Sequence, residues 1–176
     1  AGYAVTTAYD ATLLGSNAGI SLTEGIGNTA LGSNVMVSMT TGDFNTAVGV
    51  QALNTDDVGR GTTAIGYQAL FSQNSDSNDE DTGNTFLGAS AGFYNVTGTG
   101  NTLVGRQAGN GTDGNSYSYA TAVGYRAGYA LTTGGVTAFG YEAAKNSTTG
   151  GGVDFDSGEK YRVTAVGATS ITIVQH

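Results

Sequence analysis

A five-residue core of the form x-Thr-apolar-apolar-Gly recurs nine times along this chain of 176 residues and restricts its fold more than any other feature. The motif ends at Gly15, Gly32, Gly49, Gly66, Gly88, Gly105, Gly124, Gly140 and Gly167. The commonest spacing between successive glycines is 17 residues, and longer spacings indicate loops inserted into one basic unit. A short unit repeated at a nearly fixed period is typical of a solenoid, in which each coil packs on its neighbours.

Each motif predicts a short strand with two distinct faces. Thr stands three residues before Gly and a large apolar residue stands just before it, so period-two geometry places both on one face. We expect this face to line the coil interior. The clearest structural repeat residues are Thr29, Leu31, Gly32, Thr46, Val48, Gly49, Thr63, Ile65, Gly66, Thr85, Leu87, Gly88, Thr102, Val104 and Gly105.

The residue two before Gly points the other way and is mostly small and apolar. Small apolar side chains on an outer face favour close packing against another chain, because a single solenoid would leave them wet. We therefore predict an interface between copies, with closed threefold symmetry as the preferred arrangement. The expected interface residues are Ala30, Ala47, Ala64, Ala122 and Ala138.

The glycines predict the corners of the coil. The motif Gly fits a bend that needs positive φ or a close backbone approach, and Gly25, Gly42, Gly59 and Gly98 mark a second corner. We divide the chain into an N-terminal cap or linker (1–10), an all-β solenoid domain (11–149) and a C-terminal β cap or hairpin (150–176). The VTAVG segment near the C-terminus is either a ninth coil or an ordinary strand.

Composition excludes several other classes. Gly is abundant, but there is no Pro and no Gly-X-Y period, which excludes collagen. A net charge of −8 disfavours nucleic-acid binding, and no stretch of sequence resembles a membrane-spanning segment. The chain starts with Ala1, so we expect a processed product or a fragment.

The repeat resembles two related families of trimeric β-roll proteins. The core Asn28-Thr29-Ala30-Leu31-Gly32 is similar to the head repeats of trimeric autotransporter adhesins, and residues 42–49 (GDFNTAVG) more closely resemble GNTALG/TTG-type repeats of phage tail-fibre-like proteins. The resemblance spans roughly residues 11–144. It implies a left-handed parallel β-roll, a homotrimer and attachment to a host surface. A period near 17 is longer than that of the usual adhesin-head coil.

This resemblance favours a fibre or appendage of a virion, located outside the cell on the virion surface. The expected partners are other copies of the same chain, other fibre or virion proteins, and a glycan or protein on the host cell surface. The alternative is the head of a bacterial trimeric adhesin at the cell surface. A polysaccharide-degrading tailspike is less favoured. No enzyme is expected, since His176 is the only His, there is no Cys, and neither a Ser–His–acid set nor a His-rich metal set can be assembled.

Two surface features are candidate binding sites. The acidic insertion contains Asp76, Asp79 and Asp81, which either bind calcium or form a solvated loop; the spacing is not that of an EF-hand, and no other cofactor is expected. Three tyrosines directly after the motif Gly, Tyr67, Tyr125 and Tyr141, either stack on sugars or fill grooves between chains. The Thr ladder also matches flat ice-binding solenoids, but its predicted inner position disfavours ice binding.

Overall fold

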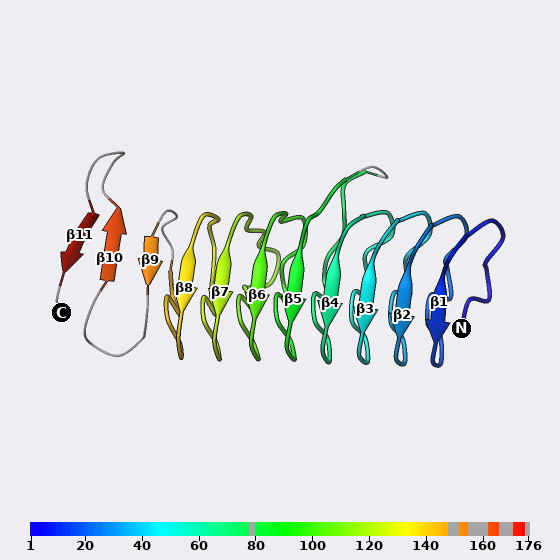
Figure 1. The fold of residues 1–176 in the computed structure, drawn as a ribbon, viewed down its shortest axis with the longest axis horizontal. Coiled ribbons are helices and arrows are strands. Elements are labelled where there is room, and N and C mark those ends of the chain that lie inside the picture. The colour runs from blue at the N-terminus through cyan, green and yellow to red at the C-terminus, as the bar shows by residue number, and fades with distance from the viewer. Residues whose placement is uncertain (78–79, 148–151, 155–161, 166–170, 175–176) are drawn as a thin grey trace.

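The structure is a computed structural model that describes residues 1–77, 80–147, 152–154, 162–165 and 171–174, with side chains described as far as residue 147. Eight short strands lie side by side in one row (Figure 1). They are β1 (Thr12–Leu14), β2 (Thr29–Leu31), β3 (Thr46–Val48), β4 (Thr63–Ile65), β5 (Thr85–Leu87), β6 (Thr102–Val104), β7 (Thr121–Val123) and β8 (Thr137–Phe139). After them come β9 (Gly152–Asp154), β10 (Arg162–Ala165) and β11 (Ile171–Val174).

The eight strands form a parallel, in-register ladder. Each motif Thr pairs with the motif Thr of the next coil, as Thr29 does with Thr46 and Thr46 with Thr63. The turns join the ladder too, because the Thr23 amide donates to the Thr40 carbonyl at 2.9 Å. The predicted all-β solenoid with coils of about 17 residues is therefore confirmed.

Both ends of the ladder differ from its middle. Residues 1–10 lie against the first coil, where the amides of Gly2 and Thr7 donate to the carbonyls of Ala18 and Thr23. At the other end β9 pairs in parallel with β8, whereas β10 is antiparallel to both β9 and β11. The Val163-Thr164-Ala165 stretch of the VTAVG segment thus forms an antiparallel strand and does not continue the parallel ladder, while Val166 and Gly167 lie outside the described residues.

The motif glycines combine the positive φ and the close backbone approach that the sequence suggests for them. Gly32 has φ of +140° and Gly49 has φ of +129°, a region that residues with a side chain rarely adopt. A Cβ on Gly49 would also lie 2.4 Å from the carbonyl oxygen of Gly66 in the next coil. Stacked backbones therefore approach too closely at this corner for any side chain.

The prediction of which strand face lines the coil interior is wrong. The residue two before Gly points into the coil: Ala30, Ala47, Ala64, Ala122 and Ala138 are fully buried within a single chain. They cannot form the outer interface that we predicted for them. The Thr and large apolar residues instead point outward, and Leu31 and Leu87 remain 43% and 45% exposed.

The reason lies on the opposite wall of the coil. Four residues after the motif Gly, Met36, Leu53 and Leu70 point into the same interior and are buried. These long side chains fill the volume, so the strand contributes only a methyl group. Where the strand residue is large, as at Phe86, the facing position is Gly92, and a Cβ there would lie 2.3 Å from the Phe86 ring. Large and small residues alternate across the core at close packing.

A ladder of buried asparagines supports the corner before each strand. Oδ1 of Asn28 accepts the amide of Asn45 at 2.9 Å, and Nδ2 of Asn28 donates to the carbonyl of Gly42 at 2.6 Å. Asn45 repeats the pattern with the amide of Thr62 and the carbonyl of Gly59. Each asparagine thus satisfies backbone groups that the corner removes from the ladder.

Candidate functional site

The strands present one continuous face to solvent, which we call the outer strand face. It consists of the Thr and the large apolar residue of each of β1–β8: Thr12, Leu14, Thr29, Leu31, Thr46, Val48, Thr63, Ile65, Thr85, Leu87, Thr102, Val104, Thr121, Val123, Thr137 and Phe139. Within the single chain all sixteen are exposed or partly exposed, and Leu14 reaches 65%. Apolar residues scattered singly over a surface need no explanation, but a continuous apolar column of this length does.

In-register pairing makes this face regular. Thr46 lies beside Thr63 and Val48 beside Ile65, so like residues stand above one another at the strand spacing of about 4.8 Å. The result is one column of hydroxyl and methyl groups next to one column of large apolar side chains. A flat, regular, half-apolar surface of this kind suits contact with another ordered surface.

The structure brings together two of the three candidate tyrosines. The rings of Tyr125 and Tyr141 stack with centroids 5.4 Å apart and planes 16° apart. Tyr67 is 53% exposed but stands apart from them, because Ala89 and Arg106 occupy the same position of the two intervening coils. Tyr67, Tyr125 and Tyr141 thus do not form one continuous ladder.

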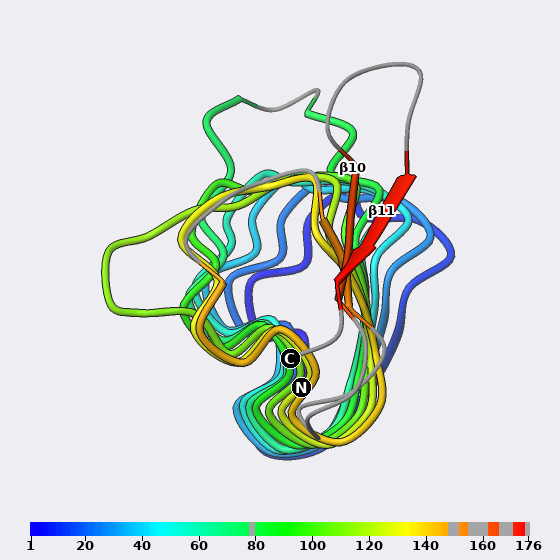
Figure 2. The same ribbon diagram turned by 90° about the vertical axis from the view of Figure 1, so that its left-hand side faces the viewer.

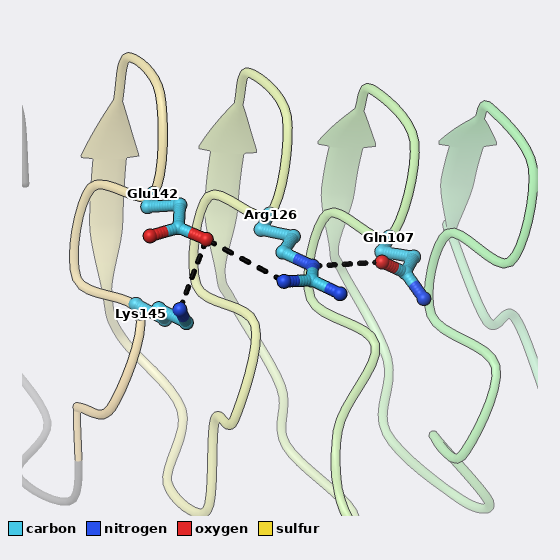
Figure 3. Close-up of polar contacts among 4 residues, drawn as sticks. All are labelled: Gln107, Arg126, Glu142 and Lys145. Carbon is cyan, nitrogen blue, oxygen red and sulfur yellow. Dashed lines mark hydrogen bonds and ion pairs between the residues drawn. The ribbon is translucent and has the colours of Figure 1, made fainter.

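Charged side chains accompany this tyrosine pair on the turn that follows each strand (Figure 3). Nε of Arg126 donates to Oε1 of Gln107 at 2.8 Å, and its Nη1 lies 3.6 Å from Oε1 of Glu142. Nζ of Lys145 donates to the same Glu142 oxygen at 2.9 Å. The hydrogen bond from Lys145 is the main cause that lowers the pKa of the Glu142 carboxyl below its usual value.

Sequence reasoning missed the basic residues of this turn. Arg106 and Arg126 stand one and two residues after their motif glycines, and Lys145 stands five after Gly140. The repeat alignment contained the signal, because basic residues are rare in this chain and these three occur in successive repeats. Only the fold shows that positions one, two and five after Gly lie on the same corner.

The acidic insertion is tied to the neighbouring coil (Figure 2 shows it projecting from the stack). The amide of Arg60 donates to the carbonyl of Glu80 at 3.1 Å, and the amide of Asp76 donates to Oε2 of Glu80 at 2.8 Å. Asp79 lies outside the described residues. Across the described part of the chain, no three His, Cys, Asp or Glu side chains are grouped closely enough to hold a metal ion. Calcium binding by Asp76, Asp79 and Asp81 stays a prediction.

One carboxyl is buried in the coil interior, at Asp56. Oδ1 accepts the amides of Ser75 at 3.0 Å and Gly59 at 3.3 Å, while Oδ2 is buried without a hydrogen-bond partner. Burial raises the pKa of this carboxyl, because the charged form loses its hydration. Asp56 occupies the interior position that Leu22 and Met39 hold in earlier coils.

No family model, curated protein or solved structure matches this chain. The function proposed below therefore rests on the chemistry of the outer strand face and of the turn that holds Arg126, Glu142 and Lys145. Among the described residues, no helix is long and apolar enough to cross a membrane.

Proposed function

We propose that this chain is part of a non-enzymatic attachment fibre of a virion, built from three copies that associate through the outer strand face into a left-handed trimeric β-rod. The observation that carries the proposal is the exposed apolar column of β1–β8, in which Leu14, Leu31, Leu87 and Phe139 are at least 40% exposed. Burying such a column contributes about 25 cal/mol for each Å² of apolar surface removed from water, which offsets the entropy lost on association. The interface is thus proposed on the face opposite to the one that the sequence suggested.

Three copies suit the shape of this face better than an open arrangement. Each chain offers one flat apolar face, and a closed symmetric assembly covers every copy of it without leaving an edge for further growth. The resemblance of the repeat to phage tail-fibre-like and adhesin-head repeats supports threefold closure and a role in host-surface attachment. The bacterial adhesin head remains the alternative setting for the same rod, and a polysaccharide-degrading tailspike is less favoured.

The proposal is tested by solution mass. Light scattering at several concentrations is expected to give three times the chain mass of 17.6 kDa. Leu31→Lys and Leu87→Lys place a charge in the proposed interface and are expected to give monomers. Ile26→Lys is the matched control, because Ile26 is similarly exposed at 38% but lies outside the outer strand face.

A monomeric wild-type mass at every concentration would refute the association. So would trimers that survive both interface substitutions with unchanged stability. Loss of the trimer in Ile26→Lys as well would show that the effect is a general one of surface charge.

Ice binding is a second candidate, favoured by one observation. The sequence disfavoured it because the Thr ladder was expected inside the coil, whereas the structure places all eight Thr side chains on the outer strand face. The two functions need the same surface, so they exclude each other within one molecule. A monomeric wild-type protein that separates the melting and freezing temperatures of ice, and loses this activity in Thr46→Lys, would support ice binding over the fibre.

A further inference from the structure

Basic side chains are concentrated on one corner of an otherwise acidic rod. The whole chain carries a net charge of −8. The described side chains include four basic ones, and three of these, Arg106, Arg126 and Lys145, follow the successive strands β6, β7 and β8. This local reversal of sign is a feature that packing of the coils does not require.

One tyrosine ring brings the two guanidinium groups to a common place. Cζ of Arg106 lies 5.9 Å and Cζ of Arg126 5.2 Å from the centroid of the Tyr125 ring. Tyr141 stacks on Tyr125 and is itself 60% exposed. We call Arg106, Tyr125, Arg126, Tyr141 and Lys145 the basic corner.

The positive charge of the basic corner is only partly neutralised. Glu142 uses a single oxygen, Oε1, to contact both Arg126 and Lys145, so one carboxylate serves two cations. Arg106 is exposed and forms no ion pair with any residue that the structure describes. The side chains of Arg126 and Lys145 retain 32% and 36% exposure, which leaves their remaining donors accessible.

We propose that the basic corner binds a carboxylate-bearing sugar unit of an acidic polysaccharide. A guanidinium offers paired N–H donors that match the two oxygens of a carboxylate, and Arg106 has no competing acid. The exposed Tyr141 and the partly exposed Tyr125 add apolar ring surface and hydroxyl groups, the combination that suits a sugar. Three coils at the strand spacing give a length on the order of 10 Å, enough for a short saccharide segment.

The rest of the surface favours this ligand over nucleic acid. Nucleic-acid affinity depends on neutralising many phosphates along an extended basic surface. Here the basic side chains of the corner are confined to the turns after β6, β7 and β8, while Asp43, Asp57, Asp76 and Asp81 belong to earlier coils and the acidic insertion. The three cations of the basic corner match the carboxylates of one or a few sugar units, whereas duplex DNA gains its affinity from many more phosphate contacts than this corner offers. The inference rests on the proposed role in surface attachment and specifies the ligand of that role.

Binding is tested with polygalacturonate as the carboxylated probe, by calorimetric titration at low and physiological salt. The wild-type protein is expected to bind it, more weakly as salt rises, and not to bind neutral dextran. Arg106→Gln is expected to weaken binding about tenfold, the effect of losing one charge-assisted contact. Arg60→Gln is the matched control, because Cζ of Arg60 also lies 5.9 Å from an aromatic centroid, that of Phe44, but on the acidic part of the rod.

Several outcomes would overturn the basic corner as a saccharide site. These are absence of binding at low salt, equal binding of dextran, polyglutamate or duplex DNA, or equal weakening by Arg60→Gln. Solution mass and unfolding midpoint are measured on every variant, so that misfolding is recognised. A trimeric wild-type rod that ignores polygalacturonate refutes this inference alone, whereas a monomer that binds it through Arg106 refutes the trimer alone.

Discussion

The ring of Phe86 occupies the space that a side chain at Gly92 would need, since a Cβ on Gly92 would lie 2.3 Å from Cε1 of the ring. One coil earlier the same two positions hold Ala64 and Leu70, both fully buried. Leu103 and Gly109 repeat the large-with-glycine pairing one coil later. In these three coils each pair therefore supplies one large side chain to the core. At the next pair, Ala122 and Gly128, both residues are small and Leu131 packs at Gly128 instead.

This pairing predicts a rescue. Phe86→Ala is expected to lower the free energy of unfolding by about 3–5 kcal/mol because it leaves a cavity. Gly92→Leu alone is expected to be at least as harmful, since the new side chain meets the ring. The double variant should recover much of the loss, because Leu70 is accommodated at the equivalent position with φ of +49°. Urea unfolding of the four proteins measures the coupling, and strictly additive losses would contradict the pairing.

The asparagine ladder predicts a large cost for a small truncation. Asn45→Ala removes the acceptor of the Thr62 amide and the donor to the Gly59 carbonyl, leaving both buried groups without these partners. The expected loss is about 2–4 kcal/mol in unfolding free energy. Asn115→Ala is the control, because its Nδ2 donates to Oγ1 of Thr112 at 2.7 Å in an exposed loop and should cost less than about 0.5 kcal/mol. Equal effects would contradict a structural role for the ladder.

The buried carboxyl of Asp56 predicts a stability that depends on pH. Burial raises its pKa in the folded protein, so the folded state holds the proton more tightly than the unfolded state does. This contribution to stability is present at low pH and is lost as the pH rises from about 4 through the raised pKa. Asp56→Asn should remove that decline and increase the unfolding free energy at pH 7 by about 1–3 kcal/mol.

Urea unfolding of this variant between pH 4 and pH 8 provides the measurement. Asp57→Asn changes the net charge equally at the adjacent, partly exposed residue, and thereby separates burial from overall charge. If Asp56→Asn keeps the wild-type slope, the buried carboxyl does not cause the pH dependence.

The corner glycines predict a difference between two residues that both have positive φ. Gly49→Ala is expected to cost several kcal/mol, roughly 3 or more, because it combines φ of +129° with a Cβ 2.4 Å from the Gly66 carbonyl oxygen. Gly114→Ala should cost only about 1–2 kcal/mol, since φ is +76° and no atom lies within 4 Å of the added Cβ. Thermal unfolding of the two variants tests whether the close approach of coils, and not φ alone, selects glycine.

Much of the fold could be predicted from the sequence because the repeat is local information. The spacing of the motif glycines predicted the coil length, the Thr ladder predicted the parallel register, and the conformation of Gly32 and Gly49 followed from their place at the corners. The clustering of Arg106, Arg126 and Lys145 was not predicted, because they stand one, two and five residues after their motif glycines and only the folded coil shows that these positions share one corner.

The alternation of residues in each strand determined by itself that two faces exist, but only the tertiary structure decided which face is inside. Size suggested that Leu31 and Val48 should be buried and that Ala30 and Ala47 should face outward. The opposite wall of the coil reverses this, because Met36 and Leu53 already fill the interior and leave room for a methyl group alone. Residues six apart in the sequence thus compete for one volume, and this competition turns the apolar column outward as part of the outer strand face.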